Sequence, residues 1–189
     1  METKLYIKNM VCDRCIKVVK SELSQLGYNV VQITLGEAII ESDKSHDLTE
    51  IKNVLVGNGF DLVDDKTSKL IEKIKVLIIN KIHHDSEALE KFSFSKFISK
   101  EIAVNYSHLS SVFSAGEGIT IEKFIIKQKI EKVKELLTYD ELTLSEIAYK
   151  LGYSSVQHLS NQFRQVTGLN PTYFKKLKDR KRNPLDHLE

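Results

Sequence analysis

Apolar residues at helical spacing mark the stretch from Thr143 to Phe174. The pattern predicts two short helices on either side of Gly152, because glycine adopts positive φ without strain and so ends a helix readily. Ser154 or Ser155 is expected to cap the second helix. The buried positions would be Leu144, Ile147, Ala148 and Leu151 in the first helix and Leu159 and Phe163 in the second. Two short helices across a tight turn form a helix-turn-helix.

A second copy of this pattern lies upstream. The spacing H-L-S-x2-F-x4-G-x5-F occurs from His158 to Phe174 and again, 50 positions earlier, from His108 to Phe124. Further upstream the offset is 49, so Ala103 corresponds to Gly152. Internal repetition of this kind predicts two related units, at about 95–114 and 144–167. In the first unit the second helix is expected to end at Ser114.

Three further helices complete the predicted C-terminal part. A broad apolar stripe from Leu70 to Ile82, capped by Thr67 or Ser68, predicts the first. A long helix capped by Thr120 and reaching Leu137 would join the two helix-turn-helices. A closing helix would begin at Pro171, a position at which proline is tolerated. The Lys and Glu run from 127 to 135 is interpreted as a solvated helix face.

The first 65 residues follow a different pattern. Short apolar stretches at strand spacing alternate with two amphipathic helical stretches, in the order β-α-β-β-α-β. This order predicts a ferredoxin-like sandwich, in which two helices cover one face of a four-stranded antiparallel sheet. The expected fold class is α+β, with this domain at 1–65 and an all-α domain at 66–183. Little flexible linker separates the two, so we expect their relative orientation to be restricted.

Charge is distributed unevenly between these parts. Residues 1–65 contain 7 Lys and Arg against 11 Asp and Glu, whereas residues 66–189 contain 21 against 15. Only the second part would therefore be attracted to a polyanion such as nucleic acid. No apolar run reaches the length of a membrane span, and the start of the chain lacks the apolar core of a signal peptide. We expect a cytoplasmic protein that does not bind a membrane. The sequence shows no catalytic triad, phosphate loop or carboxylate cluster, so we do not expect an enzyme.

Both cysteines of the chain lie in the sequence Cys12-Asp13-Arg14-Cys15, where the first strand meets the first helix. In a reducing cytoplasm the pair is expected to bind metal, to undergo redox chemistry, or to have no present role. The first helical turn favours a thiolate at Cys15. Two thiolates suit Cu(I), whereas Zn(II) prefers four ligands and would need two chains to pool their cysteines or additional ligands.

Met10-x-Cys12-x-x-Cys15 on the first loop of a βαββαβ domain resembles the heavy-metal-associated domain of copper chaperones and metal-transporting ATPases. Asn9 stands where that family usually has glycine. The resemblance implies a soft metal ion at Cys12 and Cys15, with Met10 as a secondary candidate ligand. Cu(I) is favoured, and Zn(II) or another soft metal is the alternative.

The C-terminal part resembles the DNA-binding domain of AraC/XylS-type transcription regulators. The similarity is carried by Ser145-Glu146-Ile147-Ala148-x2-Leu151-Gly152-Tyr153 and by Phe163-Arg164-x3-Gly168-x2-Pro171-x2-Phe174. The family implies that one chain carries both helix-turn-helices. It also implies that their second helices enter successive major grooves of double-stranded DNA, about 34 Å apart.

This resemblance assigns DNA contacts residue by residue. In the first unit they are Ser107, Ser110 and Ser111, with His108 alongside; in the second they are Val156, Gln157, Ser160 and Asn161, with Arg164 toward the backbone. Lys175 and Lys176 are expected to contact phosphates. Gln157 or Asn161 suits a bidentate contact with adenine, so we expect the second unit to discriminate bases more sharply.

The preferred hypothesis is a transcription regulator that responds to a soft metal ion at its cysteine pair. A thiol-based redox-sensing regulator is one alternative, and a metal-trafficking protein whose helical half binds a protein partner is another. Either a monomer or a dimer is compatible with the sequence.

Overall fold

The computed structural model describes residues 2–41, 47–63, 66–85 and 88–178. The chain divides into two compact units, and each is built from two separate segments. One comprises Met1–Asn80 with Ile98–Gly118, and the other comprises Lys81–Phe97 with Ile119–Glu189. The predicted domain boundaries at residues 65 and 183 fall outside the described residues and stay predictions. No helix among the described residues has the length and apolar character needed to cross a membrane.

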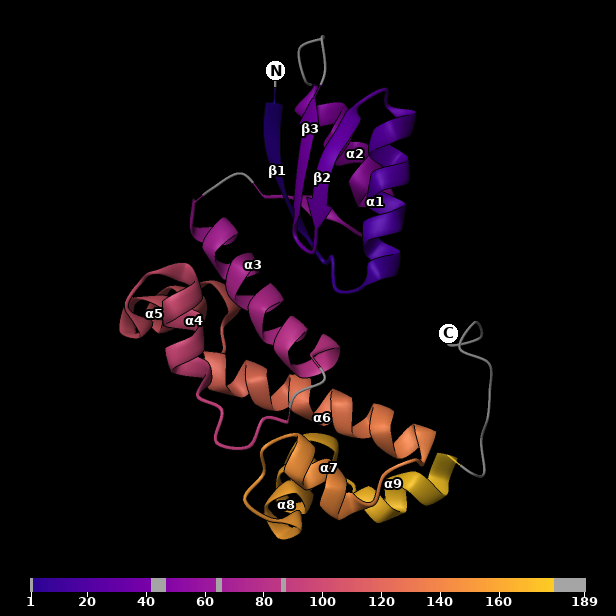
Figure 1. The fold of residues 1–189 in the computed structure, drawn as a ribbon, viewed down its shortest axis with the longest axis vertical. Coiled ribbons are helices and arrows are strands. Elements are labelled where there is room, and N and C mark those ends of the chain that lie inside the picture. The colour runs from indigo at the N-terminus through magenta and orange to yellow at the C-terminus, as the bar shows by residue number, and fades with distance from the viewer. Residues whose placement is uncertain (1, 42–46, 64–65, 86–87, 179–189) are drawn as a thin grey trace. The chain divides into compact units, whose positions relative to one another are not determined.

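A four-stranded antiparallel sheet forms the N-terminal part of the first unit (Figure 1). Its strands are β1 (Glu2–Lys8), β2 (Asn29–Thr34), β3 (Glu37–Glu41) and β4 (Asp61–Leu62), in the spatial order β2-β3-β1-β4. Helix α1 (Asp13–Gln25) follows β1, and helix α2 (Leu48–Gly57) follows β3. The side chain of Asp47 caps α2 by accepting from the backbone N–H groups of Thr49 and Glu50. The predicted β-α-β-β-α-β order and the mixed α+β class are confirmed.

Alternation of side chains along the strands places the core of this part between the sheet and its two helices. The buried side chains include Leu5, Ile7, Met10, Val19, Leu23, Ala38, Ile40, Ile51 and Leu55. Each fully buried large aliphatic side chain contributes roughly 1.5–3 kcal/mol relative to exposure. This core therefore fixes the end of β1, from which the loop with the two cysteines departs.

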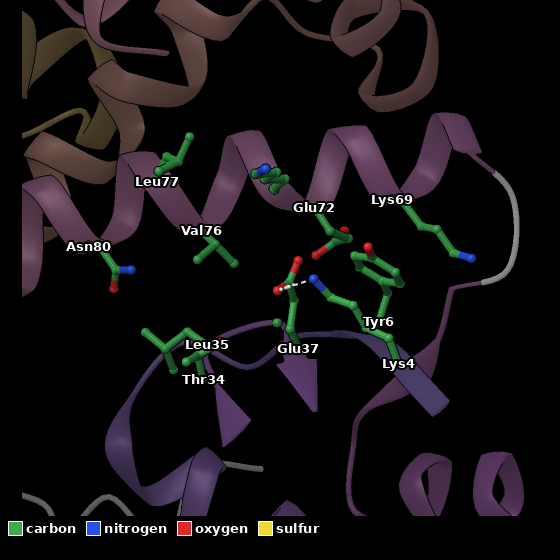
Figure 2. A pocket seen from close by; sticks show the side chains of 12 residues that line it. Lys4, Tyr6, Thr34, Leu35, Glu37, Lys69, Glu72, Val76, Leu77 and Asn80 are labelled. Carbon is green, nitrogen blue, oxygen red and sulfur yellow. Dashed lines mark ion pairs between the residues drawn. The ribbon is translucent and has the colours of Figure 1, made fainter. Parts of the chain in front are cut away.

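Helix α3 (Lys66–Ile79) packs against the turn between β2 and β3. A Cβ added to Gly36 in that turn would lie 3.0 Å from Cγ2 of Val76, so the absence of a side chain permits the contact. Figure 2 shows Val76 pointing from α3 toward the turn, beside a cavity of about 250 Å³. The predicted cap at Thr67 or Ser68 is wrong, because the helix already includes Lys66.

Helix α3 also packs against helix α5 (Tyr106–Glu117), which belongs to the same unit. Lys75 of α3 lies 3.1 Å from Glu72 and 2.8 Å from Glu117. A Cβ on Gly116 would lie 2.3 Å from Cδ1 of Ile71. The prediction that this helix ends at Ser114 is wrong, because α5 continues through Gly116 to Glu117 and ends at the left-handed Gly118.

Helix α4 (Phe94–Ile102) precedes α5 across a turn at Ala103, which has φ of 58°. Asn105 caps α5, because its side chain accepts from the backbone N–H of Ser107 at 2.8 Å. Gly118, with φ of 67°, ends α5. The first predicted helix-turn-helix is thus present as α4 and α5.

The second unit contains the second helix-turn-helix. Its helices are α6 (Ile121–Tyr139), α7 (Leu144–Lys150), α8 (Val156–Thr167) and α9 (Pro171–Lys178). Thr120 caps α6, Thr143 and Glu146 form a reciprocal capping box on α7, and Ser155 caps α8. Gly152 has φ of 68°, the same left-handed conformation as Ala103. The correspondence that the sequence repeat predicted between these two turn residues is confirmed.

Candidate nucleic-acid interface and cysteine pair

Four buried side chains set the orientation of the two candidate recognition helices. Leu109 and Phe113 of α5, and Leu159 and Phe163 of α8, have no solvent exposure. Phe163 also packs edge-on against Phe174 of α9, with ring centroids 5.5 Å apart. Because these apolar faces are buried, each helix presents its opposite, polar face to solvent.

The exposed face of α8 carries a bonded pair of amide side chains. Nε2 of Gln157 donates to Oδ1 of Asn161 at 3.0 Å, across one helical turn. The Asn161 amide nitrogen keeps its hydrogens, and the Gln157 carbonyl oxygen keeps its lone pairs. The two side chains therefore offer a donor and an acceptor side by side.

The other residues predicted on α8 lie close to this pair in sequence. Arg164 is exposed, whereas Val156 and Ser160 are half-buried. His158 fixes the start of the helix, because its backbone N–H donates to Ser155 Oγ at 3.0 Å. Its Nδ1 lies 3.0 Å from Ser154 Oγ, and its ring packs edge-on against Tyr153.

The corresponding face of α5 offers fewer free groups. Ser107, His108 and Ser111 are exposed, and Ser110 is half-buried. Ser111 Oγ donates back to the carbonyl oxygen of Ser107 at 3.0 Å. This hydroxyl is therefore already used within the helix, and α5 presents small hydroxyls and one imidazole.

The two lysines expected to contact phosphates differ in their surroundings. Lys175 forms an ion pair with Asp140, which follows α6, whereas Lys176 is exposed. A phosphate contact by Lys175 would therefore compete with this ion pair.

Lys129 departs from the sequence interpretation. The run 127–135 was expected to form a solvated face, but Lys129 Nζ lies 5.8 Å from the ring centre of Phe94 and 5.3 Å from that of Tyr153. Burial lowers the pKa of Lys129 to about 8. The expectation is wrong at this residue because two aromatic side chains cover its ammonium group.

The two cysteines converge at the start of α1. Both are free, half-buried thiols, and their sulfur atoms lie 3.5 Å apart. The hydrogen bond from the backbone N–H of Cys15 lowers the pKa of the Cys12 thiol. Burial opposes this shift, and hydrogen bonds from the Cys15 side chain and from Arg14 add to it. The thiolate form of Cys12 is therefore stabilised.

Asn9 shapes the loop that holds the cysteines. Its φ of 68° lies in the left-handed region, which glycine adopts freely and asparagine tolerates better than most residues. Its side-chain Nδ2 donates to the carbonyl oxygen of Gly59 at 2.9 Å, and its own carbonyl oxygen lies 3.8 Å from Cys15 Sγ. Asparagine thus meets the backbone requirement that glycine would meet and adds an anchor.

Met10 is almost fully buried in the hydrophobic core, so its placement favours packing over ligation. Among the described residues, no group of three or more His, Cys, Asp or Glu side chains is placed to hold a metal ion. Two neighbouring thiols, one with a lowered pKa, fit a soft ion that accepts two sulfur ligands. They do not by themselves fit tetrahedral Zn(II).

Comparison with known proteins places the helical part. Residues 98–177 match a family described as a helix-turn-helix domain. LumQ, a probable transcriptional regulator from Photobacterium leiognathi, is 23% identical over 140 residues, covering 74% of this chain and 54% of LumQ. YfiF, an HTH-type transcriptional regulator from Bacillus subtilis, is 33% identical over 80 residues, covering 42% of this chain and 25% of YfiF. The chain spans about half or less of the length of the curated relatives it matches.

A similar fold occurs in the C-terminal domain of AraT, a response regulator from Geobacillus stearothermophilus. The TM-score is 0.50 at 22% identity, over 66% of this chain and 95% of that domain. Residues 98–177 therefore form a helix-turn-helix domain. The relatives carry the names of regulators and not of enzymes, in agreement with the sequence-based expectation.

The geometry of the cysteine pair predicts the pH dependence of its reactivity. Because the pKa of Cys12 is lowered, alkylation of Cys12 by iodoacetamide should persist to lower pH than for an ordinary thiol. Arg14→Gln removes one of the hydrogen bonds that stabilise the thiolate, so the profile should move to higher pH. Lys17→Gln, an equal change of charge on the same helix, should leave the profile in place. Site-resolved mass spectrometry measures Cys12 alkylation across pH in wild type and in both variants. Identical pH profiles for wild type and Arg14→Gln would contradict the assigned role of Arg14.

Proposed function

We propose that the chain is a sequence-specific, double-stranded-DNA-binding transcription regulator. The observation that carries this proposal is the duplication itself: two helix-turn-helices bury equivalent Leu and Phe side chains and turn equivalent polar faces outward. The relatives named as transcriptional regulators support it. In this proposal α5 and α8 enter successive major grooves, about 34 Å apart.

Base discrimination would rest mainly on α8. In the major groove adenine presents N7 as an acceptor and its N6 amino group as a donor. The free donor of Asn161 and the free acceptor of Gln157 complement that pattern. The small hydroxyls of α5 offer less discrimination, and Arg164 and Lys176 supply charge for phosphate contacts.

For the N-terminal part we propose a ferredoxin-like domain of the heavy-metal-associated type that responds to a soft metal ion, Cu(I) foremost. The strand order β2-β3-β1-β4, the paired thiols and the left-handed Asn9 support this proposal. Cys12 and Cys15 would hold the ion, which would supply a tight bond to two sulfur atoms. A thiol-based redox sensor is a second candidate, favoured by the same short distance between the two sulfur atoms.

The amide pair on α8 gives a direct test of DNA recognition. Asn161→Ala should weaken binding to a duplex selected from a random pool by about 1–3 kcal/mol, because one base contact is lost. The salt dependence should stay as in wild type, since no phosphate contact changes. Gln25→Ala is the matched control, because it removes an exposed amide from α1, a helix with no proposed DNA contact. Equal affinities of Asn161→Ala and wild type in a fluorescence-anisotropy titration would refute the assigned role.

Metal response is tested by DNA affinity measured anaerobically with and without one equivalent of Cu(I). We expect wild type to change affinity on loading and the Cys12→Ser/Cys15→Ser variant not to change. Equal affinities of wild type in both conditions would remove the sensing proposal and leave DNA binding intact. A change on oxidation without metal would instead favour the redox sensor. A chain that binds no duplex, but binds a protein partner through its helical half, would favour metal trafficking.

A further inference from the structure

Residues 88–92 form a short segment, here called the strap, that is fixed to the second helix-turn-helix within the second unit. The backbone N–H of Leu89 donates to the carbonyl oxygen of Lys150 at the end of α7, at 2.9 Å. The Leu89 side chain is buried, and the N–H of Phe92 closes a turn onto the Leu89 carbonyl oxygen at 3.1 Å. The strap is therefore bonded to the end of α7.

The turn of the helix-turn-helix is shaped to receive the strap. A Cβ at Gly152 would lie 2.3 Å from the Leu89 carbonyl oxygen. Any residue other than glycine would therefore clash with the strap backbone at this position. At the other end of the strap, the Phe92 ring packs against Phe94 and Phe97, with centroids 5.0 and 5.3 Å away. Both ends of the strap are thus held by specific contacts.

An open cleft of about 510 Å³ lies between the strap and the second helix-turn-helix. Glu90 and Lys91 line it from the strap, and Ser154, Ser155 and Val156 line it where the turn leads into α8. The Glu90 carboxylate is engaged by a hydrogen bond with the Tyr149 side chain, which raises the pKa of Tyr149. Lys91 is exposed and has no hydrogen-bond or ion-pair partner among the described residues. The cleft therefore has one uncommitted positive charge beside the start of α8.

We propose that Lys91 binds a backbone phosphate of the DNA next to the point where α8 enters the major groove. This inference rests on the proposed function. Lysine binds phosphate as a point charge, and such contacts set position and affinity without reading sequence. Because the strap is anchored at both ends, less chain entropy is lost when Lys91 binds than for a lysine on a free loop. The strap would be a DNA-contacting element separate from both helix-turn-helices, supplied by the segment between α3 and α4.

The test measures the affinity of full-length variants for a selected duplex and for a random duplex of equal length, across salt concentrations. Lys91→Gln should lower the slope of log affinity against log salt by about 0.9, and should weaken binding roughly tenfold at 0.1 M salt, for both duplexes alike. Lys91→Arg should retain wild-type behaviour. Lys91→Gly keeps the positive φ of 57° accessible while removing the charge, so it should match Lys91→Gln.

Lys20 is an exposed lysine of α1, so Lys20→Gln is the matched control for net charge. It should leave the slope of log affinity against log salt unchanged. Wild-type binding with an unaltered slope in Lys91→Gln would overturn this inference alone. A loss confined to the selected duplex, or an equal loss in Lys20→Gln, would overturn it as well. Absence of salt-dependent binding by wild type would overturn the proposed function together with it.

Discussion

The constraint on which the rest of this structure depends is the burial of one leucine and one phenylalanine on the second helix of each helix-turn-helix, α5 and α8. Leu109 with Phe113, and Leu159 with Phe163, are withdrawn from solvent completely. Residues spaced three and four positions apart share one face of a helix. Burial of the face with the leucine and the phenylalanine therefore decides which residues are exposed. The polar groups of Gln157 and Asn161 are therefore exposed to solvent because Leu159 and Phe163 are buried on the other face of α8.

Left-handed backbone positions connect this packing to function. Ala103 and Gly152 lie in the turn between the two helices of each helix-turn-helix, and both have positive φ. Asn9, just before the cysteine pair, also has positive φ. At Gly152 the turn also admits the strap, since only hydrogen on Cα leaves room for the Leu89 carbonyl oxygen. A single residue thus positions both α8 and the segment that carries Lys91. At Asn9 the side-chain bond to Gly59 ties the cysteine loop to the chain just before β4.

Much of this organisation could be predicted from the sequence, because it rests on local patterns. Helix caps such as Thr120 and Ser155 depend on residues close together in the chain, and the repeat that equates Ala103 with Gly152 is visible as a repeated residue spacing. The features that escaped prediction depend on contacts between distant segments. Lys129 is covered by the rings of Phe94 and Tyr153, and Gly116 of α5 lies against Ile71 of α3. Lys91 lies in a segment without periodicity, so only its attachment to α7 reveals its place.

Hydroxyl-radical footprinting of the full chain, on a duplex selected from a random pool, shows whether one chain binds DNA through both helix-turn-helices. Two helices in successive major grooves should give two protected segments about one helical turn, or 10 base pairs, apart. Substitution of exposed residues on α8 should weaken one segment, and substitution on α5 the other. A single protected segment, or protection that every such substitution removes in full, would contradict binding through both helix-turn-helices.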